Sequence, residues 1–314
     1  MSSAYSPAQI AQYEAYIALP SHLRLINKPS LTASYLTTLH VHQLSKVPYE
    51  NLQLHYSPSH AISLDPNVLF RKIVIDARGR GGYCMENSIF YNHILKALGF
   101  DAYTVGVRIR ARYDGIPRGD YIGWVHIVNI VTLPNGERYM VDVGFGGDGA
   151  TQPLPLIPNQ ATTNLGTQEV RLIRDFIPTQ TRRQDEKDKL WIYQYRNGTH
   201  LEWNSFFAFP ETEFLPQDFE VMNFYTSQSF AATNFQTRRL LIVLFLKGEE
   251  GEQIVGKVML VNGEVKRNDG GKTKTILSCK TEAERIRALS EHFGISLTDE
   301  QRDGIKGRNV ELRE

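Results

Sequence analysis

The spacing of apolar residues changes near residue 100, and this change constrains the fold more than any other feature of the sequence. Up to that point apolar residues recur every three or four positions, as they do on one face of a helix. From residue 101 they alternate with a period of two, and Pro, Asn and Gly separate the apolar runs, which favours an antiparallel sheet or barrel. The remaining third of the chain mixes strands and helices, so the sequence predicts an α+β fold.

Three domains are expected from this order. Residues 1–100 are predicted to be helical, residues 101–206 to form an antiparallel β-barrel, and residues 207–314 to contain a linking helix and an α/β region. A chain of 314 residues is long enough for two or three domains with a substantial core. The segment 179–189 is densely charged and holds no apolar residue, so it is expected to be an exposed loop.

Composition argues against several kinds of partner. The 35 Lys and Arg residues balance 34 Asp and Glu residues, which provides no basic field for nucleic acid. The longest apolar run, residues 240–246, is much shorter than a membrane span requires, and the N-terminus has no signal-peptide pattern. Two cysteines, Cys84 and Cys279, cannot form a disulfide framework and suit a reducing compartment. We therefore expect a cytoplasmic protein that binds neither nucleic acid nor membranes.

Several patterns that often bind ligands carry little weight here. Residues 144–149 match the dinucleotide motif GxGxxG, but three prolines follow within nine residues, where that motif requires a helix. Residues 271–273 resemble the end of a phosphate-binding loop that lacks its first glycine. The histidines and cysteines show no metal-ligand spacing, so no metal is expected. Arg108, Arg110 and Arg112 alternate along a predicted strand, and a solvated face is favoured over an anion site.

The segment RGGYCMEN at residues 80–87 is the strongest local signal for chemistry. Its two glycines permit tight backbone geometry, and Cys84 then stands at the predicted start of an amphipathic helix. Free amide donors and the helix dipole stabilise a thiolate at such a position, so a depressed pKa of Cys84 is expected. The alternative is that Cys84 is a small buried hydrophobic residue, as most free cysteines are. Placement alone does not separate these two interpretations.

A nucleophilic cysteine needs a base and a group that orients the base. His126 lies inside an apolar strand, where a lone histidine is more often structural, and Asp142 lies in a similar setting on the next strand. If residues 134–136 form a three-residue loop, the two side chains become diagonal neighbours on one face, within reach of a hydrogen bond. A two-residue loop would place them on opposite faces. The geometry permits a Cys–His–Asp triad but does not force it.

These segments together resemble the arylamine N-acetyltransferase family. RGGYCMEN looks like the nucleophile motif of that family, and residues 47–52, VPYENL, are similar to its V/I-P-F-E-N-L segment. Residues 141–146, VDVGFG, are similar to the segment that carries the triad aspartate, and residues 218–223 and 292–297 also look familiar. The resemblance implies an N-terminal helical bundle, a central β-barrel and a C-terminal α/β lid, in an architecture related to papain-like proteases and transglutaminases.

The resemblance also implies an activity. Cys84 would be the nucleophile that accepts an acyl group, His126 its imidazole partner, and Asp142 the group that orients the imidazole. The donor would be acetyl-coenzyme A or another short acyl-coenzyme A, and the acceptor an arylamine, arylhydrazine or arylhydroxylamine. The kinetics would be ping-pong through an S-acyl-cysteine, no metal would be needed, and the enzyme would act as a monomer in xenobiotic metabolism.

Further positions match the family outside the triad. Phe145 falls where an aromatic residue lines the acceptor pocket, and Gly123 and Ser229 fall near the coenzyme A arm. Glu50 and Arg80 are interpreted as an ion pair that supports the cysteine loop. A malonyl donor would need a cationic partner in the pocket, and the sequence assigns none, so acetyl, propionyl and malonyl donors all stay open.

Two other functions remain open at this point. The same triad would serve a hydrolase or a transglutaminase-like amidase that uses water or a peptide as its partner. A binding protein without catalytic activity is the second alternative, with Cys84 merely buried. Whether an acyl-cysteine persists in water distinguishes a hydrolase or amidase from a transferase. The reactivity of the Cys84 thiol distinguishes a binding protein from an enzyme.

Overall fold

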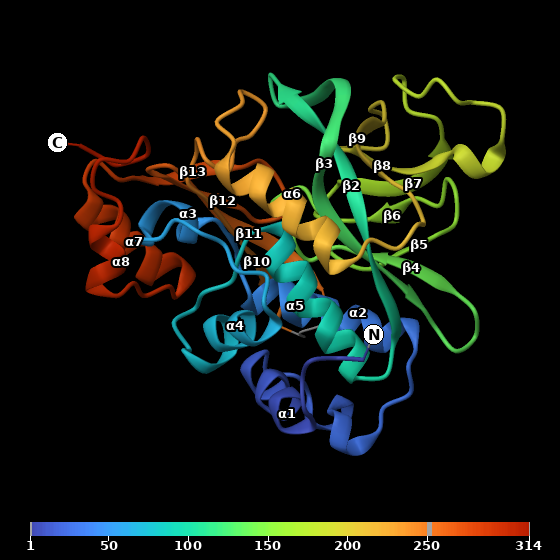
Figure 1. The fold of residues 1–314 in the computed structure, drawn as a ribbon, viewed down its shortest axis with the longest axis horizontal. Coiled ribbons are helices and arrows are strands. Elements are labelled where there is room, and N and C mark those ends of the chain that lie inside the picture. Colours follow the sequence, from blue (N-terminus) through green and yellow to red (C-terminus); the bar gives the residue numbers. More distant parts are fainter. Residues whose placement is uncertain (1, 250–252, 314) are drawn as a thin grey trace.

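A computed structural model describes residues 2–249 and 253–313 of the chain. Figure 1 shows the first helices at one end, a large sheet on one side, and the C-terminal sheet with its helices on the other, while α5 and α6 run through the middle. The fold is α+β with a nearly closed antiparallel barrel, as the change of apolar period predicts. The division into three domains stays a prediction, and one strand, β9, crosses the boundary expected after residue 206.

The N-terminal region is helical. Ser6 caps the first helix, whose first residue is Pro7, an arrangement that satisfies the free amide groups at the helix start. The helices are α1 (Pro7–Tyr16), α2 (Ala33–Lys46), α3 (Leu52–Tyr56), α4 (Pro66–Phe70) and α5 (Cys84–Ala97), with short helical turns η1 (Ser21–Leu23), η2 (Leu25–Asn27) and η3 (Arg71–Ile75).

The central sheet has eight antiparallel strands in the order β5-β4-β3-β2-β9-β8-β7-β6. Their side chains enclose an apolar core that includes Val105, Val128 and Val170. The strands are β2 (Asp101–Tyr113), β3 (Ile116–Thr132), β4 (Arg138–Val141), β5 (Leu154–Pro155), β6 (Thr162–Thr163), β7 (Glu169–Asp175), β8 (Leu190–Arg196) and β9 (Asn204–Phe209), and η4 (Glu186–Asp188) lies in the charged loop.

The C-terminal sheet has five strands in the order β1-β10-β11-β12-β13. Its first strand, β1 (Tyr49–Glu50), comes from the N-terminal region and pairs with β10, so this sheet joins the two ends of the chain. The other elements of this region are α6 (Pro216–Gln228), β10 (Leu241–Lys247), β11 (Ile254–Val261), β12 (Glu264–Asn268), β13 (Lys274–Ser278), α7 (Glu282–Phe293) and α8 (Asp299–Asp303).

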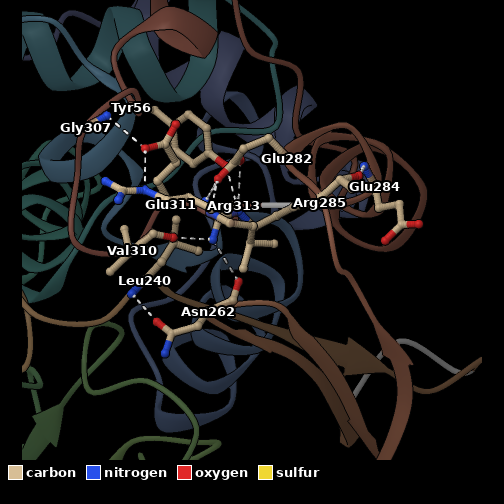
Figure 2. Close-up of polar contacts among 12 residues, drawn as sticks. Tyr56, Leu240, Asn262, Glu282, Glu284, Arg285, Gly307, Val310, Glu311 and Arg313 are labelled. Carbon is tan, nitrogen blue, oxygen red and sulfur yellow. Dashed lines mark hydrogen bonds and ion pairs between the residues drawn. The ribbon is translucent and has the colours of Figure 1, made fainter.

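A buried arginine fastens α7 to the rest of the molecule (Figure 2). The side chain of Arg285 is fully buried, and its Nε donates a hydrogen bond of 2.8 Å to the hydroxyl of Tyr56 on α3. Its Nη1 donates to the carbonyl of Val310 in the C-terminal segment at 2.9 Å, and its ion-pair partner is Glu282. These contacts attach the last helices to α3, which begins directly after Asn51 and two residues after the end of the short strand β1.

The β3–β4 hairpin has the predicted register. The amide of Leu133 donates to the carbonyl of Glu137 at 2.8 Å, and Gly136 has a φ of +87°, which a glycine adopts without strain. The last pair of this ladder joins Asn129 and Val141. The expectation that Asp142 lies within a strand is wrong by one residue: β4 ends at Val141, and the carboxylate stands at the start of the loop that follows.

Candidate active site

Two glycines bring the chain tightly around the start of α5. A Cβ atom on Gly81 would lie 1.9 Å from the carbonyl oxygen of Pro48, and one on Gly82 would lie 2.5 Å from the Cβ of Glu86. The carbonyl of Gly82 also accepts a hydrogen bond of 2.9 Å from the amide of Glu50. Only glycine fits these positions, and the close approach sets Cys84 at the first turn of α5.

Cys84 is buried at this helix start, with 4% of its surface exposed. Its thiol donates to the carbonyl of Val125, the residue before His126, with a distance of 3.7 Å between sulfur and oxygen. Burial raises the pKa of the Cys84 thiol, and the negative charge of Asp142 raises it further, while the amide of Met85 lowers it less. The expected depression of this pKa is therefore wrong, because the surrounding chain removes the thiol from water.

His126 and Asp142 form a buried hydrogen-bonded pair. Nε2 of His126 lies 2.7 Å from Oδ2 of Asp142, and each side chain is only 1% exposed. The other carboxylate oxygen, Oδ1, accepts a hydrogen bond of 2.9 Å from the amide of Gly144. An ionised carboxylate only accepts hydrogen bonds, so Nε2 carries the proton and Nδ1 is the free nitrogen of the neutral ring.

The loop after Asp142 packs directly on the segment that contains Cys84. A Cβ atom on Gly144 would lie 2.8 Å from both the Cα and the carbonyl oxygen of Cys84. Val125 on β3 contacts the Cys84 thiol through its carbonyl oxygen, and Gly144 in the loop packs against the Cys84 backbone. The structure thus brings Cys84, His126 and Asp142 into one buried site.

Buried asparagines hold α5 against β3, and the sequence analysis missed them. Nδ2 of Asn92 donates to Oδ1 of Asn129 at 2.8 Å, and Nδ2 of Asn129 donates to the carbonyl of Ser88 at 3.1 Å. Asn129 lies on β3 three residues after His126, so this network fixes the helix that starts at Cys84 relative to the histidine. A polar residue inside an apolar strand was the available signal at Asn129.

Glu50 and Arg80 form a buried ion pair behind the glycine turn. Nε of Arg80 lies 2.9 Å from Oε1 of Glu50, and Oε2 of Glu50 accepts a 2.7 Å hydrogen bond from the amide of Leu52. Burial alone would raise the pKa of Glu50, but the charges of Arg80 and Lys72 outweigh it and hold that pKa below its usual value. The carboxylate stays charged and ties the cysteine loop to β1.

Aromatic rings form one wall of the site. The ring of Phe145 meets that of His126 edge-on, with centroids 5.0 Å apart, and it lies 4.7 Å from Phe206 and 4.9 Å from Phe207. The ring of Tyr193 stacks on Phe207 at 4.5 Å. Sequence analysis singled out Phe145 alone, although two adjacent phenylalanines in a predicted β-region were a signal for a wide aromatic surface.

The two residues expected near coenzyme A lie on different elements. Gly123 is exposed on β3, three residues before His126, and nothing lies within 4 Å of the position of a Cβ atom there. Ser229 directly follows α6 as its C-cap, and its hydroxyl oxygen accepts a hydrogen bond from the amide of Ala231 at 3.2 Å. Their role toward coenzyme A stays a prediction.

Among residues 2–249 and 253–313, no group of three or more His, Cys, Asp or Glu side chains is arranged to hold a metal ion. No helix within the same ranges has the length and apolar character needed to cross a membrane.

Comparison with known proteins agrees with the geometry. A family model described as N-acetyltransferase matches residues 32–302. The chain belongs to the arylamine N-acetyltransferase family. It is 36% identical to the N-malonyltransferase FDB2 of Fusarium pseudograminearum, over 96% of this chain and 92% of that protein. It is 27% identical to the arylamine N-acetyltransferase of Escherichia coli, over 84% of this chain and 83% of that protein.

Solved structures of the family share the fold. The arylamine N-acetyltransferase of Salmonella typhimurium superposes with a TM-score of 0.76 at 23% identity, covering 95% of this chain and 97% of that one. The Mycobacterium marinum enzyme in complex with coenzyme A has a TM-score of 0.75 at 21% identity, covering 96% of this chain and 99% of that one. These structures show that the fold is shared, and the family match over residues 32–302 shows that the chain is an enzyme of the arylamine N-acetyltransferase family, as the sequence resemblance implies.

Proposed function

We propose that the protein transfers a short acyl group from a coenzyme A thioester to the nitrogen of an arylamine, arylhydrazine or arylhydroxylamine, with Cys84 as the covalent carrier. The observation that supports this most directly is the buried pair of His126 and Asp142, joined at 2.7 Å, beside the cysteine at the start of α5. The aromatic wall around Phe145 suits an aromatic acceptor, because rings gain stabilisation from edge-to-face contacts.

The proposed chemistry uses His126 as the proton carrier. Since burial raises the pKa of the Cys84 thiol, the thiolate forms by passing its proton to Nδ1 of His126, and Asp142 stabilises the resulting imidazolium. The sulfur attacks the thioester carbonyl, the bond from that carbon to the coenzyme A sulfur breaks, and coenzyme A leaves with the proton from His126. An S-acyl-cysteine remains.

The second half of the cycle regenerates the thiol. The amine nitrogen attacks the acyl carbon of the S-acyl-cysteine and gives its proton to His126. The bond between the acyl carbon and Cys84 breaks, and the sulfur takes the proton back as the amide leaves. Because the first product departs before the amine reacts, the kinetics are ping-pong.

The donor is the least determined part of this proposal. The sequence leaves acetyl, propionyl and malonyl donors open, and the relative that is 36% identical carries the name N-malonyltransferase. We include malonyl-coenzyme A as a donor on that ground. We also propose that the enzyme acts as a cytoplasmic monomer in xenobiotic metabolism, as the family resemblance and the free cysteines suggest.

Intact-mass measurement tests the proposal. The protein is mixed with acetyl- or malonyl-coenzyme A without acceptor, and the mass of one acyl group is expected to appear, then to disappear when an aromatic amine is added. Cys84→Ala should abolish the added mass, while Cys279→Ala, which removes the other buried cysteine, should retain it. Labelling that survives Cys84→Ala, or no labelling with any donor, rejects the mechanism. An acyl group lost to water as fast as to the amine would favour the hydrolase instead.

A further inference from the structure

Tyr49 adds a buried hydroxyl beside the candidate active site, at a position where the family segment V/I-P-F-E-N-L has phenylalanine. Only 5% of its surface is exposed, and its ring lies 3.8 Å from the position of a Cβ atom on Gly146, in the loop that follows Asp142. Tyr49 and Asp142 also line the same small cavity. A buried hydroxyl costs free energy unless it finds hydrogen-bonding partners, so the partners of this one reveal what it can do.

A chain of side-chain amides fixes the hydrogen bonding of this hydroxyl. The backbone amide of Leu241 donates to Oδ1 of Asn51 at 2.8 Å, so Nδ2 of Asn51 faces the other way and donates to the carbonyl of Arg239 at 2.8 Å. The same nitrogen donates to Oε1 of Gln236 at 3.3 Å, and Nε2 of Gln236 donates to the hydroxyl oxygen of Tyr49. No atom in the part of the chain that the structure describes accepts a hydrogen bond from Tyr49. The oxygen is thus an acceptor, and the proton remains available to donate.

The hydroxyl of Tyr49 lies close to the sulfur of Cys84. Tyr49 forms a parallel bridge with Gly82, two residues before the cysteine, which places the two segments side by side. Burial raises the pKa of the Tyr49 hydroxyl, and a charged Cys84 raises it further, more than Glu86 or Glu50 does. All four side chains are buried and the Coulomb effect falls with distance, so the hydroxyl is closer to the sulfur than to either carboxylate. A group attached to the sulfur is the nearest partner for the free proton.

Positive charge near the site is directed elsewhere. Arg80 and Lys72, behind the cysteine loop, are each paired with a buried carboxylate. Arg108 lies on β2 one residue after the partner of His126, so it points to the opposite face of the sheet and is half-buried against Trp124. The pairing of β2 with β3 shifts at this arginine, and the expectation of a solvated face is wrong for it. A neutral hydroxyl is therefore what this region offers to an oxygen atom that becomes negative.

We propose that the hydroxyl of Tyr49 donates a hydrogen bond to the carbonyl oxygen of the acyl group at Cys84. This rests on the proposed function. When the sulfur attacks the thioester, a bond from sulfur to carbon forms and an electron pair of the carbonyl moves to the oxygen, which then carries a negative charge. The pair returns as the bond from carbon to the coenzyme A sulfur breaks. Because burial raises its pKa, Tyr49 keeps its proton throughout and acts only as a donor.

The same contact serves both halves of the cycle. Attack of the amine on the S-acyl-cysteine also places a negative charge on the acyl oxygen before the bond to Cys84 breaks. A donor that is held in place strengthens its hydrogen bond as this charge develops, and it thereby lowers the barrier more than it tightens the binding of substrate. The amide chain from Leu241 to Gln236 holds the hydroxyl of Tyr49 in this way.

Tyr49→Phe tests the proposal because it removes the hydroxyl and keeps the ring. Tyr13→Phe is the matched control, since the hydroxyl of Tyr13 is also buried and bonded to a glutamine, donating to Oε1 of Gln43 at 2.9 Å between α1 and α2. Rapid quenching and mass measurement give two rate constants, one for acylation by saturating acetyl-coenzyme A and one for transfer from the S-acetyl-cysteine to an aromatic amine.

Tyr49→Phe should lower both rate constants about 10- to 100-fold, the range of one hydrogen bond to a charged group. The concentration of acetyl-coenzyme A that gives the half-maximal rate should stay unchanged, because the charge on the oxygen exists only in the transition state. Tyr13→Phe should change neither rate constant. Gln236→Met, which removes the bond to Tyr49 but leaves its hydroxyl, should cost less than Tyr49→Phe.

Each outcome supports or overturns the assignment. Rate constants of Tyr49→Phe within about threefold of wild type overturn it. A fall in the amine step alone overturns it in favour of a contact with the acceptor, and a higher half-saturating concentration alone overturns it in favour of donor binding. Equal falls in Tyr49→Phe and Gln236→Met, or in Tyr13→Phe, overturn it in favour of a structural role. Wild-type protein that does not label at Cys84 refutes the proposed function, whereas normal labelling of both wild type and Tyr49→Phe refutes this inference alone.

Discussion

Replacing Asp142 by asparagine changes the hydrogen-bonding direction of His126 with almost no change of shape. The amide oxygen can still accept from the amide of Gly144, as Oδ1 does at 2.9 Å. The NH2 group, however, stands where Oδ2 accepts from Nε2 at 2.7 Å, and it can only donate. The ring must then carry its proton on Nδ1, the nitrogen that we propose receives the proton of Cys84.

The size of the effect follows from the lost charge. An imidazolium and a carboxylate joined by this hydrogen bond have charge centres about 4 Å apart, and at an effective dielectric constant of about 20 their attraction is about 4 kcal/mol. Each 1.4 kcal/mol of barrier is about a tenfold change in rate. Asp142→Asn should therefore slow acylation of Cys84 about 10³-fold. The same substitution in a serine-protease triad costs about 10⁴-fold.

The assay is the rate of acyl transfer to Cys84 without acceptor, followed by rapid quenching and mass measurement between about pH 6 and pH 9. The slow rate of the variant should rise with pH, because ionisation of the thiol then replaces transfer to the imidazole. Asp148→Asn, which removes a partly exposed carboxylate of the same loop, is the control and should change the rate little. A variant that stays within about tenfold of wild type, with an unchanged pH profile, would refute the role of Asp142.

Two further predictions concern stability. Glu50→Gln leaves the buried Arg80 without its counter-charge, so thermal unfolding should show that the free energy of unfolding falls by about 3–5 kcal/mol. Glu264→Gln, which breaks a solvated ion pair, is the control and should change the free energy of unfolding little. Equal losses in the two variants would contradict this account. Burial lowers the pKa of His40 from 6.5 to about 4, while its backbone bond to Ala150 opposes that shift. The unfolded chain then gains the proton first as pH falls, and about 2 kcal/mol of stability is lost between pH 7 and pH 5. His40→Gln should remove this pH dependence in denaturant titrations, and an identical slope in both proteins would exclude His40 as its source.

The hairpin that joins His126 to Asp142 could be predicted because its determinants are local. The loop residues Asn135 and Gly136 set the turn, and the turn sets the register of the strands on either side. The start of α5 was equally local, since two glycines precede a run with helical periodicity. The place of Cys84 at a helix start and the pairing of the strands that carry His126 and Asp142 could thus be predicted from the sequence.

The electrostatics of the site could not be predicted in the same way. The pattern around Cys84 contains the helix start that favours a thiolate, but it does not contain Val125 and Gly144, which cover the cysteine from distant parts of the chain. The environment of Arg108 was also hidden, because a period of two assumes a regular strand and the bulges on β3 break that period. In both cases contacts between distant parts of the chain determine the environment of the side chain, and the local sequence pattern does not contain them.

The short strand β1 affects the order in which the molecule can assemble. Its residues pair with β10, and the amide of Leu241 donates to Oδ1 of Asn51 across 190 positions of sequence. On its other side, Tyr49 forms a parallel bridge with Gly82 in the cysteine loop. During synthesis on the ribosome the loop around Cys84 therefore lacks one of its supports until β10 has emerged. The segment that contains Cys84 is among the earlier parts of the chain to be made, and its final geometry is among the last to be completed.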